Sequence, residues 1–173
     1  MNTPTLTSGQ YLTFGLGTDT FAVEIAPIRE IIEYPGLTSI PMTPSFIRGV
    51  INLRGAVVPV IDLSVRFGRA VTGIDRRTCI VIIEIASEGE MQSLGILVDR
   101  VNEVLDVSAD QIEPRPGFGL GVHADFVKGM IRHGDHFVVI LDTDRTLSAT
   151  EMAGLVGLPD VGQDAQAVLA LPA

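Results

Sequence analysis

The sequence has little of what many enzymes and secreted proteins depend on. It contains one cysteine, Cys79, which excludes a disulfide within the chain and a metal site made of cysteines alone. No apolar run is long enough to span a membrane, because the most apolar segment, residues 80–86, is interrupted by Glu84. Residues 1–10 lack the basic residue and the apolar run of a secretion signal. We therefore expect a cytoplasmic protein with no direct membrane insertion.

Basic residues are also scarce. The chain of 173 residues has twelve Lys and Arg against twenty-one Asp and Glu, a net charge of -9, which repels nucleic-acid phosphates and anionic lipids. We expect no nucleic-acid partner. Because 46% of the residues are hydrophobic and only 19% are charged, the composition predicts a packed core in one domain or two very small ones.

Short apolar runs separated by turn residues predict an all-β fold. The expected strands cover residues 11–16, 20–25, 46–53, 57–63, 78–85, 94–98, 126–132 and 137–141. Turn residues at 17–19 and at Arg54-Gly55 predict two hairpins. Pro27 suits the first turn of a helix, so we expect a short helix over residues 28–33.

The sequence repeats itself at two fixed offsets. At an offset of eighty residues five identities align, which are Phe46 with Phe126, Gly49 with Gly129, Ile51 with Ile131, Val58 with Val138, and Asp62 with Asp142. At an offset of seventy-three, residues 23–31 align with residues 96–104. This register predicts an internal duplication in which each half has the content of a five-stranded, SH3-like barrel. Because about seventy residues alone make a marginal core, the interface between the halves should be apolar and obligatory.

The candidates for catalysis and metal binding are poor. Cys79 begins an apolar run, which favours a small buried hydrophobe over an activated thiolate. His133 and His136 flank a turn, and His123 is the only other imidazole in the chain. The glycines of residues 117–121 lack the Lys-Ser/Thr ending of a phosphate loop. We expect no catalytic residue, no cofactor and no metal.

The duplicated pair Asp62 and Asp142 allows two interpretations. Paired carboxylates perform acid–base chemistry in many enzymes. Equivalent places in two repeats favour a turn-capping role with hydrogen bonds to the backbone instead. An enzyme is therefore not supported.

Interaction residues are the remaining possibility. Ile25, Ile28 and Ile31 either present one side to a partner or fill the seam between the barrels. Arg54 is either a solvated charge or pairs with Glu30 or with a carboxylate of a partner.

Several segments together resemble the CheW family of bacterial chemotaxis coupling proteins. The most specific is Gly49-Val50-Ile51-Asn52-Leu53-Arg54-Gly55, and residues 11–14, 21–25, 29–32, 59–63, 95–101 and 126–129 extend the resemblance. It covers about residues 10–147, with repeat blocks at about 11–67 and 78–147. The expected fold is all-β, with two intertwined five-stranded SH3-like barrels and one or two short helices.

The resemblance implies a non-catalytic adaptor that joins the cytoplasmic tips of methyl-accepting chemoreceptors to the histidine kinase CheA in membrane-associated arrays. It assigns receptor binding to Ile25, Ile28, Glu30, Ile31, Val98 and Val101. It assigns assembly to Gly49 and Arg54. The regulatory domain of the kinase is itself CheW-like, which implies a barrel-to-barrel contact around Ile40 and Val57.

Two parts of the chain depart from the family pattern. Ser64 stands where many relatives have Arg, which leaves a salt bridge at that corner in doubt. Residues 148–173 exceed the resemblance, and we expect a short helix over residues 151–158 followed by a disordered tail, with a flexible segment at residues 1–9. Three alternatives stay open: a CheW-like coupler in pilus or surface motility, a small-ligand β-barrel, and a hydrolase.

Overall fold

The computed structural model describes residues 8–87, 89–114 and 126–143, and the fold there is nearly all β. The strands are β1 (Gly9–Leu16), β2 (Asp19–Glu24), β3 (Ile28–Glu33), β4 (Ile47–Leu53), β5 (Ala56–Asp62), β6 (Cys79–Ser87), β7 (Glu90–Val98), β8 (Arg100–Val107), β9 (Ile112–Glu113), β10 (Val127–His133) and β11 (His136–Leu141). Two single-turn helices, α1 (Leu63–Arg66) and η1 (Ala109–Gln111), complete the described elements. The helix expected over residues 151–158 and the tail lie outside the described residues, as do His123 and residues 117–121.

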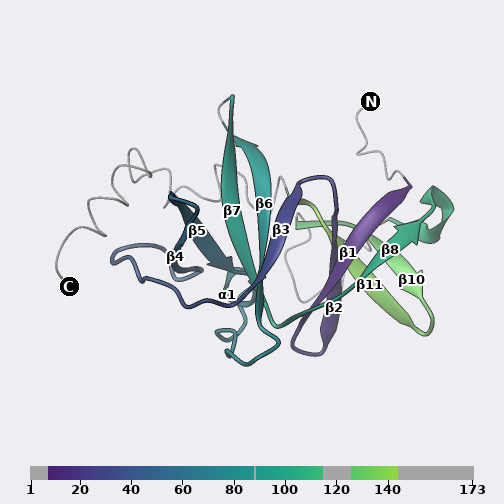
Figure 1. The fold of residues 1–173 in the computed structure, drawn as a ribbon. Coiled ribbons are helices and arrows are strands. Elements are labelled where there is room, and N and C mark those ends of the chain that lie inside the picture. The colour runs from purple at the N-terminus through teal and green to yellow at the C-terminus, as the bar shows by residue number, and fades with distance from the viewer. Residues whose placement is uncertain (1–7, 88, 115–125, 144–173) are drawn as a thin grey trace.

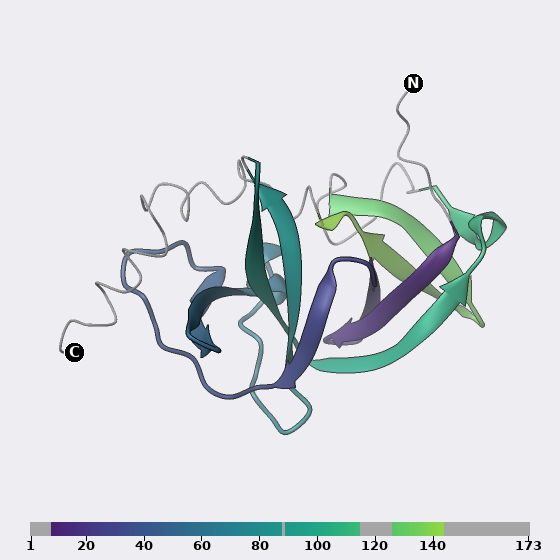
Figure 2. The ribbon, with the colours of Figure 1, turned by 45° about the horizontal axis from the view of Figure 1, so that its top comes forward.

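The strands form two sheets that lie side by side (Figure 1). We call the sheet β3-β6-β7-β5-β4 the first barrel and the sheet β8-β1-β2-β11-β10-β9 the second barrel. The first is closed by a bridge between Thr38, after β3, and Val50 on β4. The second is closed in the same way, because β9 follows β8 and pairs with β10 (Figure 2). The expected pair of small barrels is confirmed.

The two halves of the chain exchange hairpins. The β1–β2 hairpin belongs to the second barrel, where β2 lies parallel to β11, and the β6–β7 hairpin belongs to the first, where β7 lies parallel to β5. The pairing of Val60 with Gly95 is repeated as Ile140 with Ala22, which is the register predicted by offsets of eighty and seventy-three residues. The barrels are therefore intertwined as well as duplicated.

The helix expected over residues 28–33 is wrong, because this segment is the strand β3. Its side chains alternate between more buried and more exposed positions, with the two-residue period of a strand. Antiparallel pairing with β6 decides its conformation, and a bulge lies between Ile28 and Glu30. The sequence did not predict β8, the equivalent strand of the second half. The offset of seventy-three residues aligns it with the segment for which a helix was expected.

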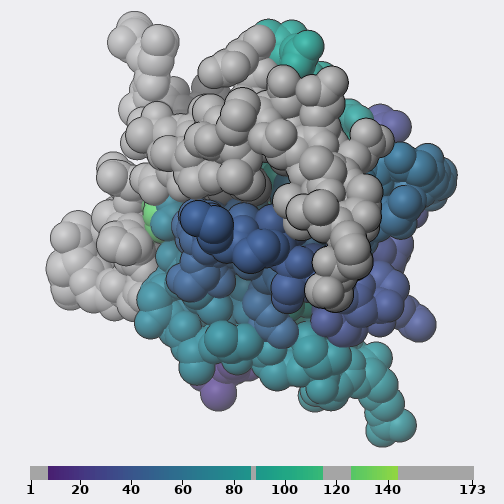
Figure 3. Space-filling model, turned by 90° about the vertical axis from the view of Figure 1, so that its left-hand side faces the viewer, coloured from purple at the N-terminus to yellow at the C-terminus, as the bar shows by residue number. Residues whose placement is uncertain are grey.

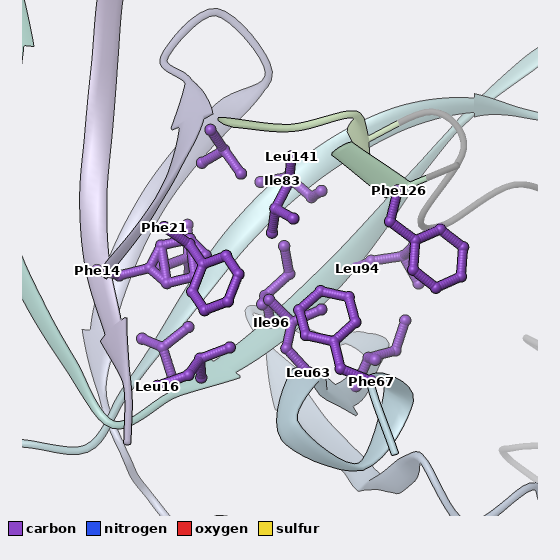
Figure 4. Packing of buried hydrophobic residues seen from close by; sticks show 14 of the residues in the cluster. Phe14, Leu16, Phe21, Leu63, Phe67, Ile83, Leu94, Ile96, Phe126 and Leu141 are labelled. Carbon is purple, nitrogen blue, oxygen red and sulfur yellow. The ribbon is translucent and has the colours of Figure 1, made fainter. Parts of the chain in front are cut away.

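Three apolar cores hold the molecule together. The first barrel encloses Ile51, Val58, Val60, Ile80, Ile82 and Leu97, and the second encloses Tyr11, Ala22, Val107, Ile112, Ile131, Val138 and Ile140. The largest cluster, here called the seam core, draws buried side chains from both barrels, among them Phe14, Phe21, Phe67, Ile96 and Phe126 (Figure 4). The predicted apolar interface between the halves is confirmed, and it contains more buried residues than the interior of either barrel.

Asp62 fixes the corner where β5 passes into α1. Its buried carboxylate accepts hydrogen bonds from the backbone N of Ser64, from the backbone N and the hydroxyl of Thr72, and from Arg48 at 2.7 Å. The capping role predicted for Asp62 is confirmed. The salt bridge that the sequence left in doubt at Ser64 is made by Arg48 instead.

Candidate interaction surface

The ion pair between Glu30 and Arg54 joins the middle of β3 to the tip of the β4–β5 hairpin. Arg54 Nη1 lies 2.6 Å from Glu30 Oε1, and Nη2 lies 3.0 Å from Oε2. At the tip, Arg54 and Gly55 have φ values of 52° and 86°, as a type I′ turn requires, and Asn52 Oδ1 accepts a hydrogen bond from Gly55 N. Of the roles left open for Arg54, the structure shows the pairing with Glu30.

The pair changes the electrostatics of Glu30. The hydrogen bonds from Arg54 lower the pKa of the Glu30 carboxyl, and the positive charges of Arg54 and Arg29 act in the same direction against a cost of desolvation. The same contact raises the pKa of Arg54. The site therefore presents a fixed, fully ionised pair on an open surface.

The apolar candidates lie along the edge of the seam core. Ile25, Ile28 and Val101 are half-buried and pack against this core, whereas Ile31 on β3 is exposed. Ile25 and Ile28 thus take part in the seam and also reach the surface, and contact with a partner stays a prediction for them. We call these residues, together with Glu30 on the opposite face of β3, the seam-edge surface (residues 25, 28, 30, 31 and 101).

Two of the sequence-predicted residues are buried and do not present a contact surface. Val98 has no exposed area and belongs to the seam core, so its assignment to receptor contact is corrected to a structural role. Gly49 is also buried, at φ +154°, and a Cβ there would lie 2.5 Å from the carbonyl oxygen of Thr38. Its lack of a side chain allows the bridge that closes the first barrel.

The candidates for barrel-to-barrel contact lie on the first barrel. Val57 is on β5 and Ile40 is in the segment before β4, and both are half-buried. Figure 3 views the molecule from this side, where the segment before β4 and the β4–β5 hairpin are blue. The sequence did not single out Met42, which is 96% exposed and adopts a left-handed φ of 65°. Neither property can be read from the sequence, because methionine is usually buried and rarely left-handed.

The described residues offer little reactive chemistry. Burial raises the pKa of the half-buried Cys79 thiol, which suits the inert hydrophobe expected from the sequence. Within residues 8–87, 89–114 and 126–143, His, Cys, Asp and Glu side chains form no group of three or more that is placed to hold a metal ion. The same residues contain no helix long and apolar enough to cross a membrane.

Comparison with known proteins decides the family. A sequence model described as the CheW-like domain matches residues 10–151. This chain belongs to the CheW family. The CheW chemotaxis protein of Klebsiella aerogenes is 36% identical over 144 residues, which cover 83% of this chain and 84% of that protein. That of Treponema pallidum is 29% identical over 153 residues, or 86% and 88% of the two chains.

A solved CheW structure shares the fold. The crystal structure of the scaffolding protein TtCheW from Thermoanaerobacter tengcongensis matches with a TM-score of 0.70 and 34% identity, over 78% of this chain and 89% of that one. As a CheW protein, this chain is a chemotaxis coupling adaptor with a role in chemotaxis signalling complexes. The alternative of a coupler in pilus or surface motility is not favoured, because the curated relatives are named for chemotaxis.

Proposed function

We propose that this chain joins the cytoplasmic tips of methyl-accepting chemoreceptors to the regulatory domain of the histidine kinase CheA, without catalysing a reaction itself. It acts on the cytoplasmic side of the membrane, where receptors form arrays. The receptor binds at the seam-edge surface, and the kinase domain binds the first barrel around Ile40 and Val57. Arg54 serves assembly by holding Glu30, and Gly49 serves it by closing the barrel.

The observation that supports this proposal most directly is the exposure of Ile31 on the seam face of β3, the face that also carries Ile28. Glu30, the next residue, points to the opposite face, so β3 carries exposed apolar area on one face and an ion pair satisfied within the chain on the other. Protein interfaces combine apolar area with polar groups of this kind. Ile28 and Val101 extend the apolar area into the seam core. A helix laid on this surface would therefore contact side chains that the fold holds rigidly.

The coupling follows from the shared core. Because both barrels contribute to the seam core, a shift at the seam edge is opposed by close-packed side chains and is transmitted to the first barrel. Receptor signalling then changes kinase activity through contacts that differ between two states of the complex, as any allosteric coupling requires.

The test is capture of a receptor signalling tip and, separately, of a CheA regulatory domain by the wild-type chain and by the Glu30→Lys variant. We expect the variant to lose receptor capture and to keep kinase capture, because the reversed charge faces Arg54. Glu90→Lys, an equal charge change in the exposed β6–β7 hairpin, is the matched control and should capture both. Capture of the receptor tip by Glu30→Lys at the wild-type level would contradict the assignment of the seam-edge surface.

A further inference from the structure

The segment that connects α1 to β6 forms an ordered loop on the first barrel, here called the arginine loop (residues 69–77). Thr72 is buried and hydrogen-bonded to Asp62, and Arg69 Nη2 lies 2.7 Å from Oδ2 of Asp19, the first residue of β2. At the end of the loop, the hydroxyl of Thr78 accepts a hydrogen bond from Asp75 N at 2.9 Å. Three separate attachments thus fix the backbone, so binding a partner would cost little ordering entropy.

The arginine loop presents apolar and basic side chains to solvent. Val71 is 62% exposed and Ile74 is 43% exposed. The guanidinium groups of Arg76 and Arg77 are exposed and have no hydrogen-bond or ion-pair partner among the described residues. Asp75 is the one acidic residue of the loop, and its carboxylate accepts from the backbone N of Arg77 at 2.7 Å.

These two arginines differ from every other basic residue in the part of the chain that the structure describes. The others are engaged: Arg29 with Glu84, Arg48 with Asp62, Arg54 with Glu30, Arg69 with Asp19, Lys128 with Glu24, Arg132 with Glu113, Arg66 over the rings of Phe46 and Phe126, and Arg100 with the carbonyl oxygen of Gly17. In a chain of net charge -9, two adjacent unpaired arginines form a local site for negative charge.

The position of the loop relates it to the seam-edge surface. The loop leads into β6, and Tyr34 N, just after β3, donates a hydrogen bond to Thr78 O at 3.1 Å. Ile31 on β3 pairs with Val81, which is four residues along the chain from Arg77. At the rise of a strand, this separation is on the order of 13 Å. The arginines therefore lie just beyond the end of β3 that carries Ile31.

We propose that Arg76 and Arg77 belong to the receptor-binding surface and bind acidic side chains of the receptor helix, with Val71 and Ile74 contributing apolar contact. The inference rests on the proposed function and adds the chemistry of the partner. Because a helix rises 1.5 Å per residue, the acidic residues lie about nine positions along the helix from the residue that packs on Ile31. Charge complementarity at this loop selects acidic receptor tips over neutral ones.

The experiment measures the affinity for a receptor signalling tip by calorimetry at low and at high salt. The double variant Arg76→Glu/Arg77→Glu should bind at least about tenfold more weakly at low salt and show a flatter salt dependence, because screening then removes less attraction. Arg132→Glu, an exposed arginine of the second barrel, is the control and should stay within about twofold of wild type. Affinity for the kinase regulatory domain should not change.

The milder variant Arg76→Gln/Arg77→Gln should shift the affinity in the same direction by a smaller factor, and it keeps the test valid if charge reversal disturbs folding. Wild-type affinity and wild-type salt dependence in both double variants would overturn the inference and leave the proposed function standing. Loss of kinase binding with intact receptor binding would also overturn it. Failure of the wild-type chain to bind the receptor tip would overturn the proposed function, and this inference with it.

Discussion

Glu30 accepts two hydrogen bonds from Arg54, which ties a central residue of β3 to the tip of the β4–β5 hairpin. The sequence separates these residues by twenty-four positions, and the curvature of the first barrel brings them together. Arg54 adopts a left-handed φ in the turn, and its guanidinium is held in place by the ion pair with Glu30. The curvature of the first barrel thus fixes where the charges of Glu30 and Arg54 lie.

The first prediction concerns the pKa of Glu30. Replacing Arg54 with Gln removes the main cause of the lowered pKa, so the carboxyl should titrate closer to its usual value near 4.5. Since the folded-state pKa is the lower one, the contribution of the pair to stability is complete above the usual pKa and is lost as the pH falls through the lowered value. NMR titration of the Glu30 side chain in both proteins measures the difference, and an unchanged pKa would contradict the role given to Arg54.

The second prediction concerns Asp62. Changing it to Ala removes the cap of α1 and leaves Arg48 and Thr72 without their shared acceptor, so the free energy of unfolding should fall by about 3 kcal/mol. Asp135→Ala, in the exposed β10–β11 turn, should change it by less than about 0.5 kcal/mol. Urea unfolding of both variants checks this, and equal effects would show that the buried network contributes little.

The duplicated register could be predicted from the sequence because aligned glycines, aspartates and apolar residues report equivalent places in two barrels. The bulge in β4 between Ile47 and Gly49 recurs in β10 between Val127 and Gly129, as the offset of eighty residues implies. The hairpin exchange that intertwines the barrels could not be derived in this way, because each half has the content of a barrel whichever hairpin completes it.

The candidate site was predicted only in part, because burial depends on tertiary packing. Val101 and Val98 lie three residues apart on successive strands, yet one reaches the surface and the other is enclosed by the seam core. The helix wrongly expected over residues 28–33 came from Pro27, a local signal that pairing with β6 overrides. Arg76 and Arg77 stand out because the other arginines of residues 8–87, 89–114 and 126–143 have partners, which the sequence does not reveal.

The third prediction separates structure from assembly at Gly49. Changing Gly49 to Ala places a Cβ against the carbonyl oxygen of Thr38, so we expect the free energy of unfolding to fall by about 2–3 kcal/mol. Gly73→Ala, where a Cβ has open space, should have little effect. Thermal unfolding measures both. A Gly49→Ala protein of normal stability that fails to assemble would assign Gly49 to a partner contact instead.

The fourth prediction concerns Met42, whose left-handed backbone is costly for a methionine. Asn tolerates this conformation better, so Met42→Asn should raise the free energy of unfolding by about 0.5 kcal/mol. Gly55→Ala, at a φ of 86°, should lower it by about 1 kcal/mol. Denaturant unfolding of the two variants gives both values, and a less stable Met42→Asn protein would show that the methionine side chain contributes to the fold.

Receptor and kinase bind different surfaces in the proposed function, so one chain holds both at the same time. The most direct measurement is sedimentation of this chain mixed with a receptor signalling tip and a CheA regulatory domain, each alone and both together. We expect a ternary complex in which all three proteins sediment together, and in which neither partner lowers the occupancy of the other. Displacement of the receptor tip by the kinase domain would contradict it, because the two partners would then share one surface.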